Sequence, residues 1–268
     1  MKISVIMPVY NGESSIYACL DSLLFNKDDI YELIIINDGS KDNSESIILK
    51  FESLFNKFIY IQHYDNLGIC KSLNAGINAS SGDWIARMDS DDICLKRRFK
   101  QQFDFCKKNS LDFCFQSSYK FDSHKKLLKF IRFENPMIHP SLFIKGSIMR
   151  DELYSLMGPA QDYELLTRLV KKYQFKINEF EVVKLGESDN QITKKNRYNQ
   201  DYNKVEISNK LIFLGSIFNF VISITAPFSI FLYEISDKKK VGFVKWVSPV
   251  FINKKYQGFR SKYFIAKK

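Results

Sequence analysis

The sequence predicts an α/β fold in which helices flank a mostly parallel sheet. Strand-like and helix-like segments alternate four times over the first 92 of the 268 residues, and this alternation requires parallel crossover connections. Polar segments also follow three of the expected strands directly, and open α/β sheets bind ligands at the carboxyl ends of their strands. We therefore expect a ligand site at one edge of the sheet.

The elements of the first half follow from apolar runs and helical spacing. β-Branched, apolar runs predict strands at residues 2–9, 31–36, 58–63 and 83–88. Apolar residues three and four apart predict helices at residues 16–24, 44–55 and 70–79. The polar segments 10–11, 37–38 and 89–92 fall at strand ends and should converge on one edge of the sheet.

The second half has a more irregular pattern. It predicts a helix at 95–108, paired strands at 111–121 and 127–133, a strand-like run at 142–145, a helix at 160–173 and a further strand within 174–185. Residues 186–206 are polar and predict no regular element.

The net charge of +10 is concentrated in the tail. Residues 234–268 contain ten Lys and Arg against Glu234 and Asp237, a local net charge of +8 that leaves about +2 for the first 233 residues. A nucleic-acid-binding domain spreads its basic residues over the folded face that binds, so we expect no nucleic-acid partner. The five Cys have no CxxC spacing and the three His are scattered, which disfavours both a disulfide framework and a zinc cluster.

An acidic cluster of Asp89, Asp91 and Asp92 follows the fourth expected strand. Alternate carboxylates can share one Mg²⁺ or Mn²⁺, which prefers oxygen ligands and phosphates. The alternative is a polar loop in which Asp92 caps the next helix. Convergence of the other polar loops on the same edge favours the cation site.

Two further carboxylates have a functional and a structural interpretation each. Asp38 can accept a hydrogen bond from a base or ribose, but turn chemistry at residues 37–39 explains it equally well. Asp162 can act as a general base for a hydroxyl group, although an acidic residue in the first turn of a helix also interacts favourably with the helix dipole.

Glycine-rich phosphate loops are missing from the chain. No GxGxxG follows the first expected strand, and no GxxxxGK[ST] occurs anywhere, which disfavours a dinucleotide dehydrogenase or a P-loop enzyme. A bound diphosphate would then need a cation and basic side chains, and the acidic cluster can hold the cation.

Six motifs in register over about the first 190 residues resemble the inverting family 2 glycosyltransferases of the GT-A (nucleotide-diphospho-sugar transferase) fold. They read SVIMPVYNGE, ELIIINDGSKDNS, NLGICKSLNAGINASSGDWIARMDSDD, ICLKRRFKQQ (with Arg98 and Gln102 in the usual places), NPMIHPSLFIK and AQDYELLTRL. Each motif alone is weak or moderate, whereas six in order are highly specific.

The resemblance assigns roles to the site residues. It implies that Asp162 is the catalytic base and that Asp91 and Asp89 bind Mn²⁺ or Mg²⁺, with Asp92 able to share the contact with the metal or with the ribose. It also implies that His139 and Gln161 lie on the acceptor side. The residues implied to bind the nucleotide sugar, with Asp38 on a uracil base and Asp89 on the ribose, are Pro8, Val9, Tyr10, Glu13, Asp38, Gly68, Lys71, Asp89 and Ser90.

Two departures from the family pattern affect this assignment. The catalytic block often reads Glu-Asp, whereas here it reads Gln161-Asp162, so a negative charge beside the base is lost. Many relatives carry a Tyr-Arg pair after the last core strand, where this chain has Lys184-Leu185-Gly186-Glu187. A phosphate contact expected there would fall to Lys194, Lys195 or Arg197.

Residues 211–233 form an uncharged stretch of 23 residues in front of the basic tail. The length could span a bilayer, but a single span would export the +8 tail, against the positive-inside rule. We therefore expect a C-terminal helical region that lies in the inner leaflet; the alternative is a buried helix that packs on the catalytic domain. The expected domains are a catalytic domain at 1–205, with a nucleotide-binding half at 1–92 and an acceptor half at 93–205, and a membrane-associating region at 206–268.

The expected function is transfer of a hexose or N-acetylhexosamine, with inversion, from a UDP-sugar to a hydroxyl group of a saccharide acceptor. The resemblance implies a lipid-linked acceptor in bacterial surface-polysaccharide synthesis (O-antigen, capsule or lipooligosaccharide) and a location at the cytoplasmic face of the inner membrane. The alternative is a membrane-associated scaffold whose transferase site has decayed.

Overall fold

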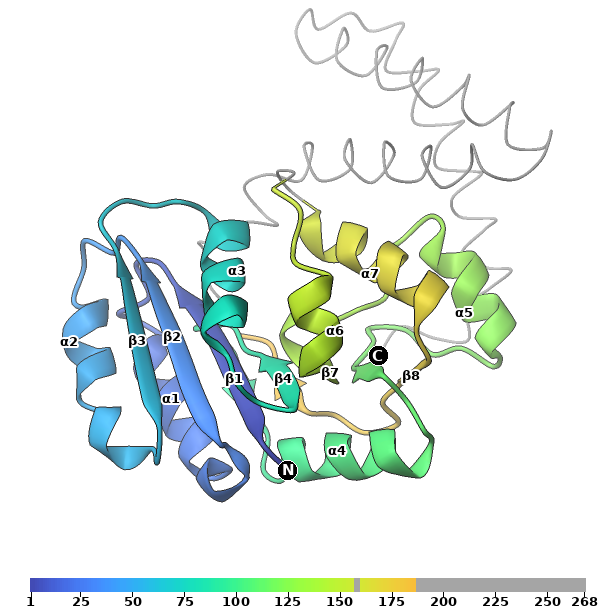
Figure 1. The fold of residues 1–268 in the computed structure, drawn as a ribbon, viewed down its shortest axis with the longest axis horizontal. Coiled ribbons are helices and arrows are strands. Elements are labelled where there is room, and N and C mark those ends of the chain that lie inside the picture. The colour runs from blue at the N-terminus through green and yellow to red at the C-terminus, as the bar shows by residue number, and fades with distance from the viewer. Residues whose placement is uncertain (157–159, 187–268) are drawn as a thin grey trace, which may run out of the picture. The chain divides into compact units, whose positions relative to one another are not determined.

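The computed structural model describes residues 1–156 and 160–186. Within them, a seven-stranded sheet has the strand order β3-β2-β1-β4-β7-β6-β8 (Figure 1). The strands are β1 (Ile3–Val9), β2 (Glu32–Asp38), β3 (Phe58–His63), β4 (Trp84–Arg87), β6 (Phe113–Phe115), β7 (Phe143–Lys145) and β8 (Phe175–Ile177). The expected α/β fold with a mostly parallel sheet is therefore confirmed.

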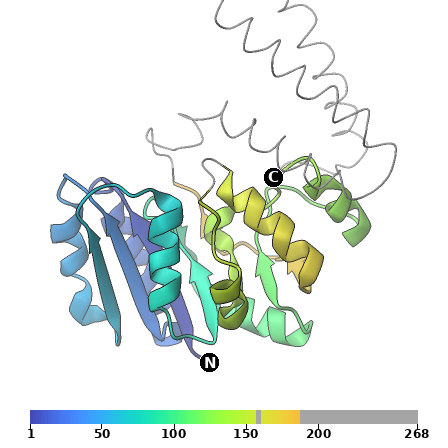
Figure 2. The same cartoon turned by 45° about the horizontal axis from the view of Figure 1, so that its top comes forward.

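The parallel half of the sheet follows the predicted order of elements. β1 pairs in parallel with β2 and β4, and β2 pairs in parallel with β3. Helices α1 (Ile16–Leu24) and α2 (Ser44–Leu49) contribute to one buried core with alternate residues of β1 and β2. Helix α3 (Ile69–Ala79) covers the other face, where Gly76 approaches Ile6 and Ile36 so closely that a Cβ atom would lie 2.6 Å from each (Figures 1 and 2).

The second half completes the sheet in a mixed arrangement. β7 pairs antiparallel with β4 and β6, and β8 pairs in parallel with β6. A second, two-stranded sheet joins β5 (Ile93–Cys94) to β9 (Val183–Lys184). The helices here are α4 (Arg98–Lys108), α6 (Gly146–Asp151) and α7 (Gln161–Lys172).

The prediction of a strand at 127–133 is wrong, because this segment belongs to helix α5 (His124–Ile131). Ser123 caps the helix by accepting a hydrogen bond from the Lys126 amide. The buried side chains of Leu127, Phe130 and Ile131 recur at helical spacing and not in alternation. Capping and period together therefore favour a helix.

Other elements also differ from the prediction. Helix α2 ends at Leu49, because the chain then turns through a 3₁₀ segment (Glu52–Leu54) that buries Phe51 and Phe55. The segment 174–185 supplies two short strands, β8 and β9, instead of one. Helix α6 was not expected at all.

The chain divides into two compact units. The described part of the first unit contains the seven-stranded sheet and every helix except α5. The described part of the second comprises residues 118–136 and Ala160, and in it Phe130 of α5 packs against the rings of Tyr119 and Phe121.

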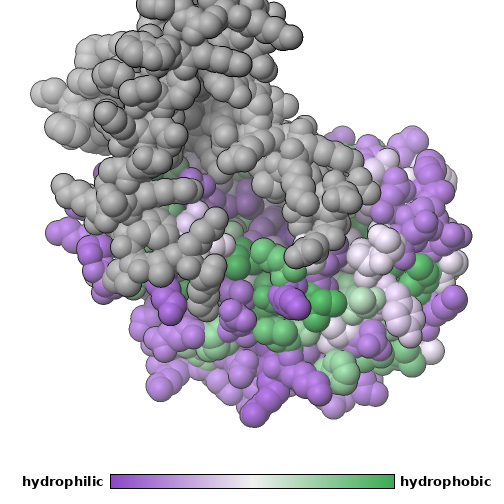
Figure 3. All heavy atoms as spheres, turned by 180° about the vertical axis from the view of Figure 1, so that it is seen from behind, coloured by the Kyte–Doolittle hydropathy of each residue, from purple (hydrophilic) through white to green (hydrophobic). Residues whose placement is uncertain are grey.

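The expected membrane-associating region at 206–268 lies outside the described residues. Within residues 1–156 and 160–186, no helix combines the length and apolar character needed to cross a bilayer. Seen from behind, the described surface is mainly hydrophilic, with hydrophobic residues gathered near the centre of the view (Figure 3).

Candidate active site

Three polar loops converge at the carboxyl edge of the parallel strands, as predicted. β1 lies between β2 and β4, with Val9 opposite Asn37 and Ile6 opposite Arg87. The ends of these neighbouring parallel strands therefore bring segments 10–13, 38–44 and 89–92 to one edge of the sheet.

Hydrogen bonds join the first of these loops to the second. The backbone N–H of Asn11 donates to Ser40 Oγ at 2.9 Å, and the backbone N–H of Lys41 donates to the side-chain Oδ1 of Asn11 at 2.8 Å. Glu13 Oε2 accepts from both the backbone and the side-chain nitrogen of Asn43 at 2.9 Å. Glu13, a predicted nucleotide-binding residue, thus fixes the start of α2.

Asp38 organises the loop that follows β3. Its Oδ1 lies 2.8 Å from His63 Nδ1 and accepts from the Leu67 amide at 3.0 Å, while Oδ2 accepts from the Gly68 amide at 2.9 Å. Only 3% of Asp38 is exposed. The carboxylate therefore holds the start of α3 in place. It can bind a ligand only through the hydrogen-bonding capacity of its two oxygens that these contacts leave unused.

The other predicted nucleotide-binding residues differ in accessibility. Tyr10 and Lys71 are exposed and Pro8 and Gly68 are partly buried, whereas the Val9 side chain belongs to the core, so Val9 can face a ligand only with its backbone. Gly68 has a φ of +91°, and a Cβ atom there would meet nothing within 4 Å. Open space thus adjoins the start of α3.

Asp89, Asp91 and Asp92 form one carboxylate cluster directly after β4. Each can supply one oxygen such that the three atoms lie within 4.8 Å of one another. Ser90, which separates Asp89 from Asp91 in the sequence, is partly buried. Burial raises the pKa of Asp89, and the charge of Asp91 adds to this rise, while Arg87 opposes it.

Arg87, a buried residue of β4, forms a two-point ion pair with Asp89 through both terminal guanidinium nitrogens. A bidentate contact of this kind fixes the orientation of a carboxylate. The Arg87 Nε atom is buried and has no hydrogen-bond partner among the described residues. Arg87 was not predicted as a site residue, although its place at the end of the strand, two residues before Asp89, was a usable signal.

Asp92 is the most buried member of the cluster. Its Oδ1 accepts from the Gly186 amide at 2.8 Å, whereas its Oδ2 is buried with no partner among the described residues. Burial, with help from the charge of Asp89, raises the pKa of Asp92 to about 7. A buried oxygen beside two other carboxylates is what a divalent cation would satisfy, so the donor set fits Mn²⁺ or Mg²⁺.

Asp162, the predicted base, lies partly buried in the first turn of α7, next to Gln161. Its charge adds to the rise in the pKa of Asp89, of Tyr154 and of Cys70, whose pKa reaches about 11 chiefly through burial. Asp162 is therefore within electrostatic reach of the acidic cluster. The described contacts thus link Asp162 electrostatically to Asp89, whereas Asp38 contacts the loop that follows β3.

His139, predicted on the acceptor side, makes a contact within the protein. Its Nε2 lies 2.6 Å from Tyr154 Oη. Burial, followed by the charge of Arg87, holds the pKa of His139 well below its usual value. The imidazole is therefore neutral at pH 7.

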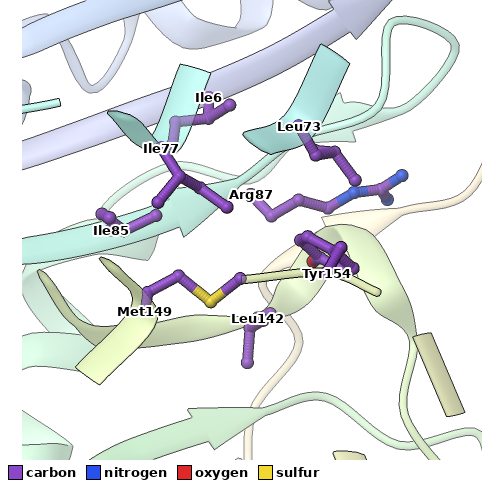
Figure 4. Close-up of a pocket in the computed structure, with 8 residues that line it drawn as sticks. All are labelled: Ile6, Leu73, Ile77, Ile85, Arg87, Leu142, Met149 and Tyr154. Carbon is purple, nitrogen blue, oxygen red and sulfur yellow. The ribbon is translucent and has the colours of Figure 1, made fainter. Parts of the chain in front are cut away.

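A small cavity of about 10 Å³ lies beneath α3, close to this network. Figure 4 shows Arg87, Tyr154 and Leu73 at one side of it and Ile77, Ile85 and Met149 at the other. This volume holds about one water molecule. The cavity is too small for a sugar nucleotide and is a gap in the packing between α3 and β4.

Arg98 and Gln102 act as internal braces of the site. Arg98 is fully buried and donates to the backbone oxygens of Arg87 (2.8 Å) and Pro140 (2.7 Å), and Gln102 donates to the Ser141 oxygen at 2.9 Å. They fix the end of β4 to the 3₁₀ turn (His139–Ser141).

A scan against protein families finds one that matches most of the described chain. The model described as Glycosyl transferase family 2 matches residues 4–168. Glycosyltransferase GlyA of Streptococcus pneumoniae is 38% identical over 91 residues, which are 34% of this chain and 13% of GlyA. The amylovoran biosynthesis glycosyltransferase AmsE of Erwinia amylovora is 27% identical over 184 residues, which are 62% of this chain and 69% of AmsE.

Solved structures share the fold. TarS 1–349 of S. aureus, in complex with UDP-GlcNAc, matches with a TM-score of 0.67 and 19% identity, over 81% of this chain and 68% of that one. The mannosyltransferase PcManGT of Pyrobaculum calidifontis, in complex with GDP-Man and Mn²⁺, matches with a TM-score of 0.64 and 14% identity, over 97% of this chain and 82% of that one.

Proposed function

Because the chain belongs to glycosyltransferase family 2, we propose that it transfers a sugar, with inversion, from a UDP-sugar to a hydroxyl group of a saccharide acceptor. The observation that carries this proposal is the cluster of Asp89, Asp91 and Asp92 oxygens within 4.8 Å, with Asp162 in electrostatic reach of it. The enzyme would be a hexosyl- or N-acetylhexosaminyltransferase.

The site residues have distinct parts in this reaction. Asp91, Asp89 and Asp92 would hold the divalent cation, which when bound supplies positive charge opposite the departing diphosphate. Asp162 takes the proton of the acceptor hydroxyl as that oxygen bonds to the anomeric carbon. The bond from the anomeric carbon to the diphosphate breaks with its electron pair, so UDP leaves and the configuration inverts.

The nucleoside would lie along the loops after β1 and β2, which hydrogen bonds join to each other. Tyr10 is exposed there, and the Asp38 loop with Gly68 and Lys71 borders it. UDP is proposed as the nucleotide because the TarS structure contains UDP-GlcNAc; GDP is the competing nucleotide, as in the mannosyltransferase complex.

The proposed acceptor is a lipid-linked saccharide in bacterial polysaccharide synthesis, at the cytoplasmic face of the inner membrane. The name of AmsE supports the pathway class. The uncharged segment 211–233, followed by a tail of net charge +8, supports the membrane location because anionic lipid attracts such tails. Sedimentation with vesicles of anionic and of neutral lipid tests this location, with the full chain compared to a 1–205 truncation. Equal binding of both proteins to anionic vesicles would show that residues 206–268 are not the membrane-binding segment.

A donor screen with two variants tests the function itself. UDP-glucose, UDP-galactose and their N-acetyl forms are each supplied with Mn²⁺, and release of UDP is measured. Asp91→Ala should abolish turnover and weaken Mn²⁺-dependent UDP binding in calorimetry, whereas Asp162→Asn should abolish turnover and leave binding intact. Full turnover by Asp162→Asn would refute the assigned base, and a wild type that binds neither UDP nor GDP with Mn²⁺ would favour the decayed scaffold.

A further inference from the structure

Asn74, on helix α3, clamps the backbone of Tyr154. The Asn74 side chain donates from Nδ2 to the Tyr154 oxygen at 2.8 Å and accepts at Oδ1 from the Tyr154 amide at 2.9 Å. The two residues are 80 positions apart in sequence. Two antiparallel hydrogen bonds from one planar amide fix both the distance and the orientation of the clamped peptide.

The clamped segment is attached to helix α7, which carries Asp162. Arg168 of α7 donates to the Leu153 oxygen at 2.8 Å and pairs with Glu152. Ser155 Oγ donates to Glu164 of α7 at 3.0 Å. Residues 152–155 and α7 are therefore joined on both sides of Tyr154.

The other end of the clamp is attached to the nucleotide side. Helix α3 packs on β1 and β2, and the Gly68 amide at its start donates to Asp38. The Tyr154 side chain also reaches His139, so its position is fixed at both backbone and ring. Asn74 thus connects α3 directly to the segment 152–155.

We propose that Asn74 is a positioning residue, which sets the place of Asp162 relative to the bound donor without contacting either substrate. This proposal rests on the proposed function, because it takes Asp162 to be the base. Loss of the clamp would let α7 shift relative to α3, and a displacement of about 1 Å in a catalytic group can lower a rate by roughly a hundredfold.

The test compares Asn74→Ala with Asn78→Ala, an exposed Asn one turn further along the same helix. The full chain is used, with Mn²⁺ and whichever of the four UDP-sugars it turns over, and UDP release is measured with water as the acceptor. Asn74→Ala should lower kcat by roughly tenfold to a hundredfold and leave KM and the calorimetric affinity for UDP unchanged. Asn78→Ala should match the wild type.

The double variant Asn74→Ala/Asp162→Glu separates positioning from other effects, because Asp162→Glu keeps a displaced carboxylate whose residual turnover can be measured. If Asn74 acts through Asp162, Asn74→Ala adds less loss of kcat to Asp162→Glu than it causes in the wild type. An equal further loss, or weakened UDP binding in Asn74→Ala, would overturn the positioning role while leaving the transferase assignment standing. Should Asn74→Ala fail to fold, Asn74→Asp, which retains the oxygen facing the Tyr154 amide, replaces it with the same expected direction.

Discussion

Arg87, the last residue of β4, forms a two-point ion pair with Asp89, which follows two positions later. Only 4% of the Arg87 side chain and 28% of the Asp89 side chain are exposed. The acidic cluster therefore carries its own counter-charge at one of its three members. This pair fixes Asp89 before any ligand arrives, whereas Asp92 is held at one oxygen by the Gly186 amide.

Replacing Arg87 should impair both stability and ligand binding. Arg87→Met should lower the free energy of unfolding by roughly 1–3 kcal/mol, because it leaves Asp89 without its charged partner. Arg87→Lys keeps the charge but not the two-point geometry, so it should retain more stability and still weaken Mn²⁺-dependent UDP binding. Urea unfolding and calorimetry measure the two effects. Strict additivity in Arg87→Met/Asp89→Asn would show that the pair is not coupled.

Gly39 and Gly68 should respond differently to the same substitution. Both have positive φ, which costs an alanine about 1–2 kcal/mol. At Gly39 the added Cβ would also lie 2.6 Å from the backbone carbon of Asp65, whereas at Gly68 it meets open space. Gly39→Ala should therefore destabilise more in urea unfolding and disturb the loop that binds Asp38. Equal losses would contradict the structure.

Arg98 should be far less replaceable than its neighbour Arg97. Arg98→Met leaves the backbone oxygens of Arg87 and Pro140 without their buried donor, at a cost of roughly 1–3 kcal/mol for each. Arg97 is exposed, so Arg97→Met should change the free energy of unfolding by less than about 0.5 kcal/mol. Denaturant midpoints compare the two, and similar losses would refute the bracing role.

His139 should make the folded state sensitive to acid. Its pKa is depressed in the folded protein, whereas the unfolded chain binds a proton near pH 6.5. Its contribution to stability is therefore complete above pH 6.5 and is lost as the pH falls below it, by up to about 1.4 kcal/mol per pH unit. His139→Gln should flatten the decline in urea midpoint between pH 6.5 and 5. The exposed His124, replaced by Gln, serves as the control, and an equal change there would refute the assignment.

The sequence was sufficient for the parallel half of the fold because its strands are short apolar runs with turn residues between them. β2 is buried at every position, and its neighbours required parallel pairing once helices separated them. The segment 127–133 was misassigned because alternation and helical spacing are hard to distinguish in a short run that contains Leu, Phe and Ile. The capping contact of Ser123 decides between them, and it is visible only in coordinates.

The predicted site was recoverable where chemistry lies next to a strand end. Asp38 and the three Asp residues after β4 could be placed in this way. Gly186 could not, because the contact of its amide with Asp92 spans 94 positions, and no local pattern marks it. The hydrogen bonds between Asn74 and Tyr154 could not be predicted for the same reason, because they depend on how α3 packs beside the segment after α6.

The contact between Gly186 and Asp92 gives the acidic cluster a mechanical link to the end of the described chain. A Cβ atom at Gly186 would lie 1.7 Å from the backbone oxygen of Asp91, so the two backbones pass each other with no room for a side chain. A cation that draws Asp92 toward itself would therefore also draw on the Gly186 amide. A side chain at position 186 would displace this backbone and, with it, the hydrogen bond that holds Asp92.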